Sequence, residues 1–186
     1  TGLHVHVASG DEEARLSAQG VLLGWPDAEG VVADMGGASL ELARVGGCDI
    51  GETASANLGP LRLAEIKDGS ARKKTIRKAV EALKEAIPRP VERLFLVGGS
   101  WRAIARLDMV RGSYPLPVLH GYEPPVSQFV ATSEWIGTQR PEAMAKATGT
   151  SLERMKLVPY AAEVLIELIA RLDPERVAIS AFGLRE

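Results

Sequence analysis

Hydrophobic and polar positions follow two periods along the chain, and each period predicts a different kind of element. Alternation with a period of two predicts strands, whereas apolar residues three and four apart predict helices. The predicted strands cover 3–7, 31–35, 40–45, part of 47–57, 93–97 and 176–180. The predicted helices cover 10–24, 59–66, 70–87, 101–108, 127–137, 141–148, 151–156 and 159–172. Hairpin strands followed by alternating helices and strands indicate an α/β fold class with a mixed sheet and flanking helices.

Local signals at the helix ends support this division of the chain. Ser9 and Glu12 have the spacing of a capping box, which predicts a helix start. Pro60 suits the first position of a short helix, and Pro88 ends the longer helix before it. The Pro-rich segment 114–126 predicts a loop, and its residues indicate no chemistry that we can assign.

The stretch "VVADMGGASLEL" (31–42) combines a tight turn with acids at both of its ends. The glycines Gly36 and Gly37 let the backbone turn sharply and let its N–H groups approach an anion. Side chains alternate along a strand, so Ser39 and Glu41 share one face, and Asp34 lies across the turn from them. Such oxygen ligands suit Mg²⁺ held together with substrate phosphates. A plain hairpin with two exposed acids explains the same pattern.

A second glycine turn occurs in "LFLVGGSWRAIARL" (94–107), which reads as strand, turn and helix. Here Gly98, Gly99 and Ser100 precede a helix whose N-terminus supplies free N–H groups and a positive dipole end. The first turn is not a Walker A loop, because no Gly-Lys-Ser or Gly-Lys-Thr follows and its glycines lead to a strand. An ordinary strand-to-helix turn remains the alternative for the segment 94–107.

Glu13 is a candidate general base on the first predicted helix. It shares a helical stripe with Leu16, Gly20 and Leu23, the side that we expect to face the protein, whereas Glu12 lies on a polar stripe. A carboxylate facing a phosphate site can activate water. Stabilisation of an acid by the helix dipole in the first turn is the simpler alternative.

Composition narrows the possible functions. The 186 residues are enough for one domain with a sizeable core, and the net charge of −2 favours neither a nucleic acid nor a membrane as partner. Cys48 is the only cysteine, so an internal disulfide is impossible. No apolar stretch approaches the ~18 residues that span a bilayer. We therefore expect a cytoplasmic protein. We read His4 and His6 as structural residues because no Cys or acid lies at ligand spacing.

A loose basic cluster on the 70–87 helix allows two interpretations. It could guide a polyanion, or it could be the solvated face of the helix, which is the more common case. The cluster comprises Arg72, Lys73, Lys74, Arg77 and Lys78.

Taken together, these stretches resemble the exopolyphosphatase and guanosine pentaphosphate phosphohydrolase (Ppx/GppA) family. That family belongs to the actin-like ATPase, or ribonuclease H-like, fold group together with sugar kinases and heat-shock ATPases. The matching stretches run in order along the chain: "SGDEEARLSAQGVL", "VVADMGGASLEL", "NLGPLRL", "LVGGSWRAIARL", "ERMKLVPYAAEVL" and "GLRE".

The resemblance implies a role for each matched position. Glu13 matches the catalytic glutamate that activates the attacking water. Asp34 and Glu41 match acids near the metal, which we expect to be Mg²⁺ or Mn²⁺. The phosphate loop is matched by Gly36, Gly37, Ala38 and Ser39, and the second loop by Gly98, Gly99 and Ser100. Catalysis would consist of positioning and of charge neutralisation during phosphoryl transfer to water.

The resemblance covers only part of the family's architecture. The family has two actin-like domains, and the first carries its own Asp-x-Gly-Ser-x-Ser loop, which is missing here. We therefore expect residues 1–186 to be a single domain, the second one, with both ends looking cut and the first domain absent. Such a domain should have little or no hydrolase activity alone. Its exposed interdomain face could also drive formation of a homodimer.

Three functions compete on this evidence. The leading hypothesis is a phosphohydrolase domain that releases terminal orthophosphate from inorganic polyphosphate, from guanosine pentaphosphate, or from both. The second is a regulatory domain that binds polyphosphate or a nucleotide without turnover, for which a base at Glu13 would be unnecessary. The third is a domain similar to sugar or acetate kinases, which would transfer phosphate to an organic acceptor instead of water.

Overall fold

The computed structural model describes residue 2 and residues 7–185. The strand predicted at 3–7, with His4 and His6, therefore lies almost wholly outside the described residues. No helix within the described part is long and apolar enough to cross a bilayer.

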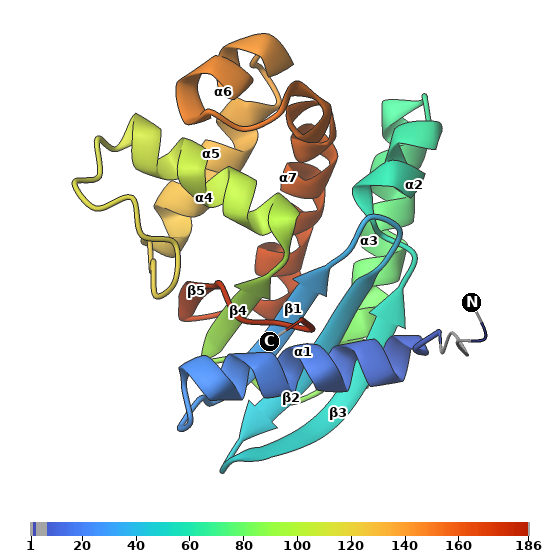
Figure 1. The fold of residues 1–186 in the computed structure, drawn as a ribbon. Helices are drawn as coiled ribbons and strands as arrows, with labels where there is room; N and C mark the ends of the chain where they lie inside the picture. Colours follow the sequence, from blue (N-terminus) through green and yellow to red (C-terminus); the bar gives the residue numbers. More distant parts are fainter. Residues whose placement is uncertain (1, 3–6, 186) are drawn as a thin grey trace.

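A five-stranded mixed sheet forms the centre of the molecule, as predicted (Figure 1). Its order is β3-β2-β1-β4-β5, with antiparallel pairing between β1, β2 and β3 and parallel pairing of β1 with β4 and of β4 with β5. The strands are β1 (Gly30–Met35), β2 (Leu40–Gly46), β3 (Asp49–Ala56), β4 (Arg93–Val97) and β5 (Arg176–Ser180).

Helices cover both faces of this sheet. α1 crosses one face alone, while α3, α4 and α7 lie on the other side (Figure 1). The helices are α1 (Gly10–Gly24), α2 (Pro60–Glu65), α3 (Gly69–Ala86), α4 (Gly99–Arg111), α5 (Val126–Ile136), α6 (Pro141–Thr148) and α7 (Leu152–Leu172). The capping box of Ser9 and Glu12 and the initial proline of α2 are present, as predicted.

The alternation along the strands divides the core into two parts. Val31, Ala33 and Met35 of β1 pack with α3, α4 and α7, whereas Val32 belongs to the smaller cluster under α1. Side chains alternate across the sheet, so Asp34 lies on the α1 face. The same alternation places the side chains of Leu40 and Leu42 on the face of the sheet away from Glu41, as the sequence predicts.

One boundary prediction was wrong. The predicted helices 151–156 and 159–172 are a single helix, α7, with Pro159 inside it. A proline removes one intrahelical hydrogen bond and normally kinks or breaks a helix. Here Val158, Ala161 and Ala162 are all buried on either side of the proline. Packing of this continuous apolar stripe therefore outweighs the local cost of Pro159.

Candidate functional site

Both glycine turns leave the sheet at the same end, because β1 and β4 are parallel neighbours. Asp34 of β1 pairs in register with Val97 of β4, so the turns that follow them are adjacent. Gly98 has φ +114°, and a Cβ atom there would lie 2.6 Å from the Met35 carbonyl oxygen and 3.1 Å from Asp34 Oδ1. Only glycine fits this position, which lets the second turn pass directly over the end of β1.

The start of α2 holds the first turn in place. The Gly36 N–H donates to the Ser39 carbonyl oxygen at 3.1 Å and closes the turn. The N–H groups of Gly59 and Leu61 donate to the carbonyl oxygens of Ala38 and Gly37, both at 3.0 Å. The turn is therefore shaped by backbone contacts with α2, which the spacing of the two segments in the sequence does not reveal.

Asp34 and Glu41 face each other across the hairpin as directly paired residues. The Ser17 hydroxyl of α1 donates to Asp34 Oδ2, and the Ser55 hydroxyl of β3 donates to Glu41 Oε1 at 3.0 Å. Burial raises the pKa of both carboxyl groups above its usual range, and the negative charge of Glu13 raises both further. The serine hydrogen bonds act in the opposite direction and favour the ionised carboxylates. Three acids are thus held close together despite mutual repulsion.

Glu13 reaches this cluster from the edge of the buried face of α1. The predicted protein-facing stripe was wrong for Leu16 and Leu23, which are 43% and 65% exposed, whereas its third member, Gly20, is buried. The buried stripe consists of small residues instead, including Ala14, Ser17 and Ala18. Small side chains let α1 lie close to the sheet. The helix is therefore rotated about its axis so that these small residues, and not the leucines, face the sheet.

A cavity of about 670 Å³ opens above these groups. Of the residues that the sequence singled out, the cavity is lined by Glu13, Asp34, Gly36, Gly37, Glu41, Gly98, Gly99 and Ser100. Ala38 and Ser39 do not line it. Ser39 instead bonds Glu41, which lowers the pKa of that carboxyl group against the effect of burial. The structure therefore brings the two turns and all three acids to one place.

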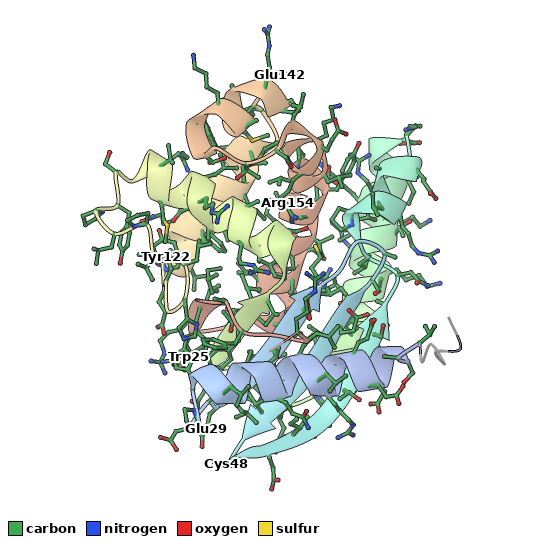
Figure 2. The ribbon with its side chains drawn as sticks, viewed as in Figure 1. Trp25, Glu29, Cys48, Tyr122, Glu142 and Arg154 are labelled. Carbon is green, nitrogen blue, oxygen red and sulfur yellow. The ribbon has the colours of Figure 1, made fainter. Side chains whose placement is uncertain are left out.

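Three arginines that the sequence argument did not single out also line the cavity. Arg102 comes from α4, Arg154 from α7 and Arg185 from the segment after β5. Arg154 projects from α7 beside the start of α4 (Figure 2), where a Cβ atom on Gly99 would lie 1.9 Å from its guanidinium. One guanidinium group can donate two parallel hydrogen bonds to two oxygens of a phosphate. Each of these arginines lies in one of the stretches that carry the family resemblance, which was the available signal.

The described residues contain no group of three or more His, Cys, Asp or Glu side chains arranged to hold a metal ion.

A second cavity, a groove of about 740 Å³, lies elsewhere between α3, α5 and α7. The basic cluster of α3 borders this groove, but its arginines are engaged. Arg72 donates to both carboxylate oxygens of Glu163 at 2.7 and 2.8 Å, and Arg77 lies 3.7 Å from Glu167. These interhelical pairs favour the second interpretation, in which the cluster is the solvated face of the helix. Its three lysines are exposed, as that interpretation requires.

Replacement of Gly98 by alanine is expected to destabilise the protein by about 2 kcal/mol, because the new Cβ would strain the backbone and meet the end of β1. Gly46→Ala is the matched control, since a Cβ atom there would meet nothing within 4 Å. Chemical denaturation of both variants measures the difference. Equal free energies of unfolding for the two variants would contradict the close approach of the second glycine turn to the end of β1.

Comparison with known proteins identifies the family. A sequence model of the Ppx/GppA phosphatase family matches residues 1–186. A Ppx/GppA family member from Aquifex aeolicus is 22% identical with a TM-score of 0.81, covering 99% of this chain and 62% of that one. An exopolyphosphatase-like protein is 21% identical with a TM-score of 0.81, covering 98% of this chain and 66% of that one. An exopolyphosphatase from Cytophaga hutchinsonii is 15% identical with a TM-score of 0.79, covering 93% and 60%.

At these identities the structural likeness establishes the fold, and it confirms the α/β, actin-like class predicted from the sequence. The chain spans less than two thirds of the length of each of these solved chains. The match of the family model over the whole length decides the identity: the chain belongs to the Ppx/GppA phosphatase family.

Proposed function

We propose that this chain is the second domain of a two-domain phosphohydrolase that releases terminal orthophosphate from inorganic polyphosphate, guanosine pentaphosphate, or both. The observation that carries the proposal is the cavity of about 670 Å³, where both glycine turns, three acids and three arginines meet. Acids alone would repel a polyanion, and arginines alone would bind it without activating water. Their combination suits a reaction between a phosphoryl group and a water molecule.

Glu13 would act as the general base in this reaction. It lies at the edge of the acid cluster and lines the cavity, whereas the Asp34 carboxylate already accepts a hydrogen bond from Ser17. A glutamate in this place can take a proton from the attacking water as the new P–O bond forms. The backbone N–H groups at the start of α4 and the three guanidiniums would bind the phosphate oxygens and orient the terminal phosphorus for in-line attack.

Asp34 and Glu41 are the residues that would hold a Mg²⁺ or Mn²⁺ ion. Their donor chemistry fits, because two hard carboxylates face each other and the pKa of each is raised by burial and, to a smaller extent, by nearby negative charge. A divalent cation would offset that repulsion, and Mg²⁺ commonly uses one or two carboxylates together with substrate phosphates. When bound, the cation would neutralise charge on the phosphoryl oxygens.

The other half of the phosphate clamp would come from the preceding domain of a longer protein. This chain covers only 60–66% of the solved relatives considered above. Family members place the site between two domains, so the cavity would be closed by the first domain. We therefore propose that activity requires both domains.

Orthophosphate release with Mg²⁺, from polyphosphate and from guanosine pentaphosphate, tests this function. The assay compares this chain with a longer protein that includes the preceding domain. We expect release only by the longer protein, and the preferred substrate defines the activity. Robust release by this chain alone would contradict the divided site. If the longer protein binds these substrates but releases no orthophosphate, the domain serves for binding and the hydrolase proposal is wrong.

A further inference from the structure

The Pro-rich segment, residues 114–125 between α4 and α5, is not an isolated loop. We refer to it as the strap. The Gly121 N–H donates to the Ile179 carbonyl oxygen, and the Ile179 N–H donates to the Tyr122 carbonyl oxygen, both at 3.0 Å. Tyr122 and Ile179 thus form an antiparallel bridge beside β5, the outer strand of the sheet. The strap therefore adds backbone pairing to the edge of the sheet just before the segment that lines the cavity.

His120 is the strap residue that contacts this segment. The Ala181 N–H donates to His120 Nδ1 at 3.4 Å, and the His120 ring lies 4.9 Å from the Phe182 ring in an edge-on arrangement. Ala181 and Gly183 both line the phosphate cavity, together with Arg185. A change at His120 would therefore act directly on the backbone that carries one of the three cavity arginines.

The same imidazole also touches the end of α1, the helix that carries Glu13. The rings of His120 and Trp25 are 4.3 Å apart, and a Cβ atom on Gly24 would lie 2.7 Å from His120 Cε1. Trp25 and Tyr122 lie on the same side of the molecule in Figure 2. Farther along α1, a Cβ atom on Gly20 would lie 2.3 Å from the Gly183 carbonyl oxygen. The helix and the cavity segment are thus in direct contact, with His120 beside both.

We propose that His120 is a positioning residue for the phosphate site: it ties the strap to residues 181–185 and to the end of α1, and so fixes Arg185 relative to Glu13. This inference rests on the proposed function. His120 touches neither the acids nor the glycine turns, so it acts only through these two elements. The neutral imidazole is required, because Nδ1 must accept the Ala181 N–H.

Protonation of His120 would remove this acceptor. Burial is the only cause of the shift that lowers the pKa of His120 below its usual value of 6.5. Asp27, Glu123 and Arg185 are the charged residues within three positions of His120 and of its contacts Trp25 and Phe182 along the chain, and no charge acts on the pKa of His120 beside burial. The hydrogen bond is therefore fully present above pH 6.5 and is lost as the pH falls through the lowered pKa of His120.

Two variants distinguish the contribution of the His120 hydrogen-bond acceptor from that of its ring. His120→Asn keeps an acceptor oxygen near the place of Nδ1 but cannot titrate, whereas His120→Phe keeps a stacking ring without an acceptor. The first readout is the amide resonances of residues 181–185 during a pH titration of this chain. The second is the affinity for inorganic tripolyphosphate with Mg²⁺, measured by calorimetry.

In the unmodified chain we expect these amides to titrate together with the His120 ring below pH 6.5, and in His120→Asn we expect no such titration. His120→Phe should weaken tripolyphosphate binding by about fivefold, the effect of one neutral hydrogen bond, and His120→Asn by less than about twofold. If His120→Phe does not fold, the comparison of the amide titrations of His120→Asn and the unmodified chain still tests the positioning role.

Unchanged amide positions at 181–185 and unchanged affinity in His120→Phe would overturn the positioning role. Absence of tripolyphosphate binding by the unmodified chain would contradict the phosphate site itself. In that case the pH titration of the amides alone would support or reject the link between His120 and residues 181–185.

Discussion

Replacement of Glu13 by glutamine should lower phosphate release by roughly 10³-fold in a longer protein that contains both domains, because a positioned general base contributes about 10²–10⁴-fold. The change removes one negative charge and keeps the size of the side chain. Substrate affinity should stay equal or rise, because Glu13 lines the cavity and its replacement removes one negative charge that repels a polyanionic substrate. Steady-state kinetics with saturating Mg²⁺ measure both effects.

Glu12→Gln is the matched control for this experiment. Glu12 is the neighbouring acid on the same helical turn, but it is exposed and caps the helix by accepting the Ser9 N–H at 2.7 Å. Glutamine can keep that hydrogen bond. Turnover should therefore be nearly unchanged in Glu12→Gln. Equal turnover in both variants would show that Glu13 is not the base.

Replacement of Asp108 by alanine should destabilise the protein by about 4 kcal/mol, because it leaves buried hydrogen-bond donors without an acceptor. Asp108 is 1% exposed. Its carboxylate accepts from the Tyr122 hydroxyl at 2.5 Å, from Gln128 Nε2 at 2.8 Å and from the Thr132 hydroxyl. These bonds join α4 to the strap and to α5. The melting temperature should fall by roughly 10 °C for a domain of this size.

Two further variants make this prediction specific. Tyr122→Phe removes one donor and should cost about 1 kcal/mol. Asp27→Ala removes an exposed acid and gives the same change in net charge, so its stability should be nearly unchanged. A loss in Asp27→Ala as large as that in Asp108→Ala would indicate a general charge effect instead of a buried network.

Sequence periodicity was sufficient for the strands of the sheet and for the hairpin around Gly36 and Gly37. It placed Ser39 and Glu41 on one face of the strand, with Asp34 across the turn from them, because alternation along a strand is a local property. It failed for α7, where burial of an apolar stripe outweighs the break that Pro159 favours. It also failed for the rotation of α1, because leucines predicted the buried face and small residues form it.

The parts of the site that escaped the sequence analysis come from long-range contacts. Ser17 approaches Asp34 from α1, which packs on the face of the sheet that carries the Asp34 side chain, and Arg154 approaches Gly99 from α7. No local spacing predicts that these residues meet. The contacts of His120 are of the same kind, since the strap reaches the cavity segment only by pairing with β5.

The most direct test of the central claim is the binding position of a phosphate chain on this domain. Glycine amides are the probe, recorded by ¹H–¹⁵N spectroscopy while tripolyphosphate and Mg²⁺ are added. The account predicts that the largest shifts occur at Gly36, Gly37, Gly98 and Gly99, with smaller changes elsewhere. Shifts confined to the groove between α3, α5 and α7, with these four glycines unmoved, would contradict it.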